Sequence, residues 1–307
     1  RMHKFNFSKA VPALLATAGG YAALIQNSEG RRARADPANK LVSGYANLPH
    51  YKKKHRGGED SWICADKMIA VADGVGGWNR KGVDPGIFTK ELCSRVMKRY
   101  TEWTTKTSDG VYRRRFEVDL WELLVSCVKE TEPRGTCTFV MGVLDDEDEH
   151  MRVLNLGDSG YMLVRKGADE QKGDVKPYEI LFRSEERQYK FNHPYQCGTG
   201  YKLPYHADVH LHKVKDSDVI IMATDGLWDN LYDSDVLGCL DVASVGGRAG
   251  IEVGEVASCL AKKAEKLSFD KTYRSPFEAN AEAAGRKHPG GKKDDITVVV
   301  SEIKLKQ

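Results

Sequence analysis

The sequence predicts an α+β protein with antiparallel sheets, and two features of its pattern lead to this class. Strand-like apolar runs follow one another without a helix between them, first at residues 61–65 and 68–72 and later at residues 138–144, 151–156 and 161–165. Helical patterns stand in separate blocks between and after these runs. Parallel βαβ units would alternate strand and helix, so hairpins and an antiparallel meander are expected instead.

The elements follow in order after a polar linker at residues 27–58. Asp66 and Lys67 separate the first two runs, which fits a two-residue hairpin turn. Helices are predicted at residues 88–103 and 120–128. Apolar side chains recur at helical spacing in the first of these, at Phe88, Leu92, Val96 and Tyr100.

The three later strand runs are joined by an acidic stretch and by "GDSG", and we expect them to pair as one meander. Residues 166–212 lack periodicity and are rich in Gly, Pro, His and Tyr, which is typical of a lid or a recognition loop. A buried strand at 219–223, a helix at 253–267 and a last strand after residue 295 complete the pattern.

Composition limits the class of protein. The chain has 307 residues, of which 41% are hydrophobic and 30% charged, so it can bury a substantial core without disulfides or metals. Its formal net charge of +3 is too small to indicate a nucleic-acid partner. None of the seven cysteines forms a CxxC pair, which argues against a structural zinc site and makes a reducing compartment the simpler interpretation.

Residues 1–45 are interpreted as an N-terminal arm, and residues 46–307 as the main domain. Residues 10–25 carry no charge and lie between basic segments, but they are slightly too few to span a bilayer readily. This pattern resembles a mitochondrial import region or its remainder. We expect a helix that anchors the arm to a membrane or to a larger mitochondrial protein complex; a plastid is the alternative location.

Acidic residues stand where apolar strands begin or end, usually beside glycine. One such Asp-Gly is an ordinary turn, but several suggest strand ends from two sheets that converge. Crowded carboxylates repel each other unless a cation lies between them, and oxygen ligands without matched Cys or His suit Mg²⁺ or Mn²⁺. The residues in question are Glu59, Asp60, Asp73, Asp158, Asp225, Asp294 and Asp295.

The motifs that hold these acids, taken in order, resemble the metal-dependent PP2C (PPM) protein phosphatase family. They are "GGED", "VADGVGGW", "GTCTF", "LGDSG", "ATDGLWDN" and "DDITVVV". Two further stretches, "GWNRKGVDPGIF" and "FNHPYQCG", resemble the organellar branch typified by yeast Ptc seven and the mitochondrial PP2C homologues of animals. The resemblance implies an α-β-β-α sandwich, in which two antiparallel sheets lie face to face with helices outside.

The resemblance also implies a centre of two Mg²⁺ or Mn²⁺ ions. Asp73 resembles the carboxylate that bridges both ions. Glu59 and the carbonyl of Gly74 resemble ligands of one ion, and Asp225 and Asp294 resemble ligands of the other.

Further roles and departures follow from the same resemblance. Asp60 resembles the acid that orients bound water, and Asp158 a ligand of a weaker third ion. Arg56 is a candidate phosphate clamp, although the run "KKKHR" that contains it could be an exposed basic stretch. Val75 stands where relatives often have a general-acid histidine, and Gly160 where they have an arginine.

The leading hypothesis is a Mg²⁺/Mn²⁺-dependent protein phosphatase that hydrolyses phosphoserine and phosphothreonine in phosphoproteins. The alternatives are a non-catalytic PP2C-like subunit of a larger mitochondrial assembly and a phosphohydrolase for small molecules. A change of Asp225 to Asn is expected to lower metal affinity sharply, whereas the same change at Asp295 is expected to be mild.

Overall fold

The chain divides into two compact units, Arg1–Asp36 and Pro37–Gln307. The structure, a computed structural model, describes residues 38–105, 118–146, 148–167, 178–200, 202–244 and 251–306, all in the second unit. The apolar stretch at residues 10–25, with most of the predicted arm, lies outside the described residues. Within them, no helix combines the length and the apolar character that crossing a membrane requires.

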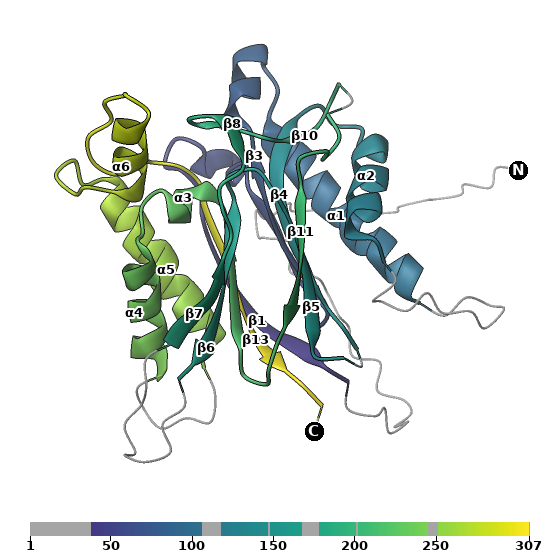
Figure 1. The fold of residues 1–307 in the computed structure, drawn as a ribbon. Coiled ribbons are helices and arrows are strands. Elements are labelled where there is room, and N and C mark those ends of the chain that lie inside the picture. The colour runs from purple at the N-terminus through teal and green to yellow at the C-terminus, as the bar shows by residue number, and fades with distance from the viewer. Residues whose placement is uncertain are drawn as a thin grey trace, which may run out of the picture. The chain divides into compact units, whose positions relative to one another are not determined.

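Two antiparallel sheets form the centre of the second unit (Figure 1). Sheet A has the strand order β1 (Lys40–Leu48), β13 (Ile296–Lys304), β12 (Val219–Ala223), β6 (Gly160–Lys166) and β7 (Tyr178–Arg183). Sheet B has the order β11 (Asp208–Lys213), β5 (His150–Leu156), β4 (Thr136–Leu144), β3 (Met68–Gly74) and β2 (Ser61–Cys64). The short β10 (Cys197–Gly198) pairs with β4, and β8 (Gln188–Lys190) pairs with β9 (His193–Pro194).

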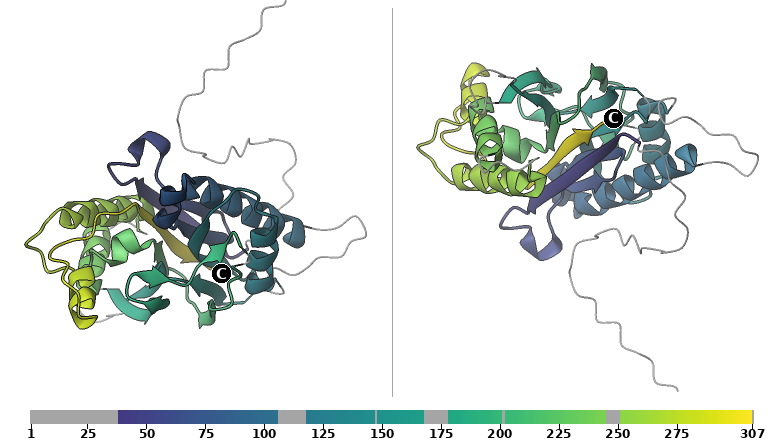
Figure 2. Two further views of the ribbon diagram at one scale, coloured as in Figure 1. Left: turned by 90° about the horizontal axis from the view of Figure 1, so that it is seen from above. Right: turned by 90° about the horizontal axis from the view of Figure 1, so that it is seen from below.

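Helices cover the outer faces of both sheets (Figures 1 and 2). On sheet B lie α1 (Pro85–Thr104) and α2 (Leu120–Glu130), and on sheet A lie α4 (Asp233–Ser244) and α5 (Val253–Ser268). Shorter pieces are the 3₁₀ helices η1 (Lys54–Arg56) and η2 (Gly76–Lys81) and the helices α3 (Asp225–Trp228) and α6 (Pro276–Ala283). The predicted α-β-β-α sandwich is therefore confirmed.

Three apolar layers hold the sandwich together. The middle layer fills the space between the sheets and includes Ile69 and Met222, both fully buried. The two outer layers pack beneath the helices, with Leu92 of α1 against sheet B and Leu260 of α5 against sheet A. Burial of each such side chain contributes about 1.5–3 kcal/mol.

The predicted three-stranded meander is wrong in one respect, because β6 does not pair with β5. It belongs to sheet A, so the "GDSG" turn carries the chain from one sheet to the other. Gly157 permits this turn: its φ of +99° favours glycine, and a Cβ there would lie 2.5 Å from Thr138 Cγ2. Apolar periodicity marks a strand but not the sheet it joins, so the sequence pattern could not show the crossing.

The predicted boundary at residue 46 is also wrong. Residues 40–48, assigned to the arm and the linker, form strand β1, which pairs with β13 from Lys40 opposite Lys304 onward. The stretch "KLVSGYANL" lacks a strong apolar signal because it is an edge strand with Leu41 as its fully buried apolar side chain. Gly44 is needed there, since a Cβ would lie 2.5 Å from the backbone nitrogen of Gly254.

Residues 166–212 are only partly irregular. Strands β7 and β11 extend sheets A and B, and β8 and β9 form a small hairpin. The segment at residues 168–177 lies outside the described residues, so the expected lid stays a prediction.

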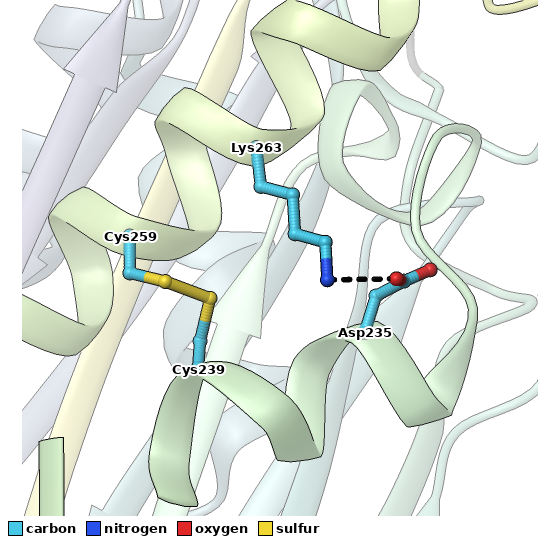
Figure 3. The surroundings of a disulfide bond; sticks show 4 residues. All are labelled: Asp235, Cys239, Cys259 and Lys263. Atoms are coloured by element: carbon cyan, nitrogen blue, oxygen red, sulfur yellow. Dashed lines mark ion pairs between the residues drawn. A yellow bond between two sulfur atoms is a disulfide. The ribbon is translucent and has the colours of Figure 1, made fainter. Parts of the chain in front are cut away.

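A disulfide joins the two helices on sheet A. Cys239 of α4 and Cys259 of α5 are bonded, with their Cα atoms 5.9 Å apart (Figure 3). Asp235 and Lys263 form an ion pair of 2.8 Å between the same helices. The expectation that the cysteines are reduced is thus wrong for this pair, whose separation of 20 residues gives no sequence signal.

Candidate metal centre

The acids of sheet B meet at one end of the sandwich because β2 and β3 are antiparallel. Strand β3 ends on Asp73 and Gly74, and Ser61 of β2 pairs with Ala72. Glu59 and Asp60, which immediately precede β2, therefore lie beside the end of β3.

Sheet A brings its acids to the same end by the same logic. Ala223, the last residue of β12, pairs with Val298 of β13 and with Gly160 of β6. The residue pairs that flank these strand ends, Thr224-Asp225, Asp294-Asp295 and Asp158-Ser159, are thereby drawn together.

Asp73, Asp158 and Asp225 form a three-carboxylate group. One oxygen of each lies within 4.8 Å of the others. Oδ1 of Asp158 and Oδ1 of Asp225 are buried without a hydrogen-bond partner among the described residues. Burial and the charge of Asp225 raise the pKa of Asp73 well above its usual range, and the same causes raise the pKa of Asp158 to about 8. Orphaned carboxylate oxygens at this spacing fit a hard divalent cation.

Asp60 is buried and fixed between the two sheets. Its Oδ2 accepts hydrogen bonds from the hydroxyls of Thr224 (2.9 Å) and Thr297 (2.8 Å), while its Oδ1 has no partner among the described residues. Burial and the nearby Asp295 raise the pKa of Asp60, and the two threonines oppose that rise. A carboxylate held in this way presents one free oxygen in a fixed direction.

Glu59 is fully buried and already surrounded by donors. Its Oε1 accepts from Arg56 Nη2 (2.5 Å) and Asn79 Nδ2 (2.6 Å), and its Oε2 lies 2.6 Å from Lys53 Nζ. Arg56 also lies 3.2 Å from a carboxylate oxygen of Asp84. Arg56 therefore lies beside Glu59 with its guanidinium bound to carboxylates, and its role as a phosphate clamp stays a prediction.

Gly74 is required by packing against Glu59. A Cβ on Gly74 would lie 2.7 Å from the carbonyl oxygen of Glu59 and 3.1 Å from Cβ of Pro85. The absence of a side chain lets the segment that carries Glu59 run close to the end of β3. The space that a side chain on Gly74 would fill is therefore occupied by the backbone of Glu59 and the ring of Pro85.

Asp294 and Asp295 have different surroundings from those predicted. Asp294 is 27% exposed and stands outside the three-carboxylate group, with Lys53 Nζ 3.5 Å from its Oδ1. Asp295 is buried, accepts from the backbone nitrogens of His50 (2.6 Å) and Glu59 (3.0 Å), and pairs with Lys53 at 2.8 Å. The expectation that Asp295→Asn would have a mild effect does not fit these contacts.

Two lysines that sequence reasoning missed supply positive charge to the acids. Lys53 contacts Glu59 and Asp295, although it belongs to the run interpreted as an exposed basic stretch. Lys292 contacts Asp225 at 2.5 Å and Asp229 at 2.7 Å. The position of Lys292 two residues before Asp294 was the signal that could have revealed it.

Comparison with known proteins identifies the family. No protein-family model matches the chain. The protein phosphatase PTC7 homolog fig of Drosophila willistoni is 33% identical over 301 residues, covering 89% of this chain and 87% of the relative. The chain belongs to the PP2C family. The probable protein phosphatase 2C 80 of Arabidopsis thaliana is 37% identical over 268 residues, covering 86% of this chain and 59% of the relative. Across five plant PP2C relatives, the chain spans only 36% to 59% of the relative's length.

Solved structures agree with a PP2C fold. The X-ray structure of the photosystem II phosphatase PBCP has a TM-score of 0.71 and 27% identity, covering 86% of this chain and 99% of that one. The catalytic domain of PstP in complex with two manganese ions has a TM-score of 0.52 and 16% identity, covering 87% and 99%, and shows likeness of fold alone.

The structure accounts for one of the two departures from the PP2C motifs. At Gly160 a Cβ would lie 2.7 Å from Ser184 Oγ and 3.0 Å from Arg183 Nη1. Arg183 of β7 stacks on the Trp228 ring at 3.7 Å, so an arginine from another strand occupies this region. Val75 offers no proton, and its backbone nitrogen donates to Thr136 O at 2.9 Å.

Proposed function

We propose that the chain is a metal-dependent phosphatase that hydrolyses phosphoserine and phosphothreonine in proteins with two Mg²⁺ or Mn²⁺ ions. The observation that carries this proposal is the three-carboxylate group at the end of a PP2C sandwich, in which Oδ1 of Asp158 and Oδ1 of Asp225 are buried without a hydrogen-bond partner among the described residues. The two manganese ions of PstP, a protein of the same fold, support the number of ions. Such ions would activate a water molecule for in-line attack on phosphorus.

Within this proposal the chain's own groups divide into ligands and supporting residues. Asp73 would hold both ions, Glu59 and the Gly74 carbonyl one of them, and Asp225 with Asp294 the other. Because Asp294 stands apart from the three-carboxylate group, its carboxylate would turn away from Lys53 on binding.

Asp60 and Arg56 would act on water and substrate. The two threonine hydroxyls fix Asp60 so that its free Oδ1 can orient a water molecule. Arg56 would hold phosphoryl oxygens once its contact with Glu59 is relaxed by a cation at that carboxylate.

Turnover by the full chain tests the proposal. A phosphothreonine peptide and a small phosphomonoester are compared with Mn²⁺ and with EDTA. Mn²⁺-dependent, EDTA-sensitive hydrolysis that favours the peptide is expected. A preference for the small ester would indicate the small-molecule hypothesis, and Mn²⁺ binding without turnover of either would indicate the non-catalytic subunit.

We further propose a mitochondrial location, with the arm attached to a membrane or to a larger protein complex. Its support is the sequence pattern of residues 1–45 and the similarity to a PTC7 homologue. The similarity to a photosystem II phosphatase keeps a plastid as the alternative. Cell fractionation of the tagged full-length protein distinguishes the two organelles, and a cytosolic pool alone would contradict both.

A further inference from the structure

The ammonium group of Lys292 is enclosed by carboxylates next to the candidate metal centre. Its Nζ lies 2.5 Å from Asp225 Oδ2, 2.7 Å from Asp229 Oδ2 and 3.6 Å from Asp294 Oδ2. The side chain is only 14% exposed. Three carboxylates therefore surround this one ammonium group and pair with its charge.

The backbone around Lys292 is clamped, so this position is built into the fold. Its N–H donates to Asn230 Oδ1 at 2.9 Å, and its carbonyl accepts from Asn230 Nδ2 at 2.8 Å. The preceding Gly291 packs so closely that a Cβ would lie 2.2 Å from the carbonyl oxygen of Leu267. The ring of Phe277 in α6 lies 5.0 Å from Nζ, a further favourable contact for a buried cation.

The contacts of Lys292 use the oxygens that a third ion would need. The family resemblance places a weaker third ion beside Asp158, which a neighbouring carboxylate would have to share. Asp225 keeps Oδ1 unpartnered for an ion of the three-carboxylate group, but its Oδ2 is bound to Lys292. Oδ2 of Asp229 is bound in the same way. An ammonium at this distance also repels a further divalent cation at the same carboxylates.

We propose that the ammonium group of Lys292 takes the place of the third divalent ion, so that the chain binds two metal ions and supplies the third cation as a side chain. This inference rests on the proposed function, since it presupposes a centre that binds two ions. The inference assigns Lys292 as a positioning residue. Lys292 holds one carboxylate oxygen of Asp225 and leaves the other oxygen free to coordinate a metal ion.

Counting bound Mn²⁺ tests the proposal without an activity assay. The full chain is dialysed against Mn²⁺ up to about 10 mM, a range that includes weak sites, and the bound ions are measured per chain. Wild type is expected to bind two ions, and Lys292→Met to bind a third at about millimolar Mn²⁺. Methionine keeps the apolar stem next to Phe277 and removes the charge.

Three further variants serve as controls. Lys293→Met changes the neighbouring lysine, whose Nζ lies 4.4 Å from the Phe269 ring centroid, and should leave two ions. Lys292→Arg keeps the charge and should also bind two. Adding Asp229→Asn to Lys292→Met removes a ligand of the new site and should return the count to two.

Each outcome decides a different claim. A third ion on wild type, or two ions on Lys292→Met, overturns the role of Lys292 and leaves the proposed function intact. A wild-type chain that binds no Mn²⁺ overturns the proposed function and this inference with it. If Lys292→Met does not fold, the wild-type titration still decides, since a third ion there contradicts the proposal and its absence supports it.

Discussion

The carboxylate of Asp60, at the start of sheet B, accepts a hydrogen bond of 2.9 Å from the hydroxyl of Thr224, at the end of β12 in sheet A. Thr297 of β13 donates to the same oxygen at 2.8 Å. These bonds cross the sandwich at the end where the acids meet. The candidate site and the contact between the two sheets are therefore stabilised by the same side chains.

Replacing Thr224 by Val should destabilise the sandwich measurably. The change keeps the shape of the side chain but removes the donor to Asp60 and the acceptor of the Thr297 N–H. We expect the free energy of unfolding in urea to fall by about 1–3 kcal/mol, because a buried carboxylate loses a partner. Thr101→Val, which removes an exposed hydroxyl bond within α1, should change it by less than about 0.5 kcal/mol. Equal stability of the two variants would show that the Asp60 contact contributes little.

Asp295→Asn should be more damaging to stability than Asp294→Asn. Asp295 is buried and uses both oxygens to accept backbone N–H groups. In the Asp295→Asn variant the side-chain NH₂ group would face one of these N–H groups, so two hydrogen-bond donors would meet. A loss of about 1–3 kcal/mol is expected in urea unfolding without metal. Asp294→Asn, at a partly exposed position, should lose less than about 0.5 kcal/mol yet bind Mn²⁺ more weakly. The reverse order of stabilities would contradict the roles assigned to this pair.

The metal-free protein should lose stability as pH rises from about 4 to 8. The folded-state pKa values of Asp60, Asp73 and Asp158 are raised, that of Asp158 to about 8, whereas an unfolded Asp titrates near about 3.9. The folded chain therefore binds more protons in this window, and its stability is present at low pH and lost as pH rises through the folded pKa values. Lys53 and Lys292 stay charged throughout, since their pKa values are raised.

Thermal melts in EDTA at about pH 5 and about pH 8 measure this dependence. Asp158→Asn should flatten it, and added Mn²⁺ should restore stability at the higher pH. A melting temperature in EDTA that rises between these pH values would mean that the acids are not crowded as described.

Opening the disulfide should weaken the helical layer on sheet A. Cys239→Ser removes a cross-link that closes a loop of 20 residues, which corresponds to about 3 kcal/mol in the chain-entropy account. Cys64→Ser, at an exposed free cysteine, is the control and should change little. If wild type and Cys239→Ser unfold at the same urea concentration under oxidising conditions, the disulfide does not stabilise the fold.

The sequence was sufficient for features that depend on local pattern. The helix predicted at residues 88–103 is α1, which begins at Pro85 with Asp84 as its N-cap. The strands that lead to Asp73 and Asp225, β3 and β12, were found from their apolar runs. The acids could be grouped because each stands at a strand end, and order along the chain then sufficed to suggest one site.

Features that depend on long-range contacts could not be predicted in this way. The position of β6 in sheet A depends on which partner it meets after the Gly157 turn, and β1 gains its strand structure from pairing with β13. Lys53 and Lys292 are buried against carboxylates that include the distant Asp295 and Asp225, so the polar stretch around Lys53 gave no sign of its burial.

Mn²⁺-dependent stabilisation of Asp225→Asn, measured beside turnover, tests the metal centre most directly. The variant keeps its shape, and Lys292 keeps Asp229 as a partner, so the metal-free fold should survive. Wild type and the control Asp241→Asn, on the outer helix α4, should melt at higher temperature with Mn²⁺, because a ligand that binds the folded form stabilises it. Asp225→Asn should lose most of that rise and about a hundredfold or more of its turnover of a phosphothreonine peptide. A wild-type response to Mn²⁺ together with wild-type turnover in Asp225→Asn would contradict the metal centre.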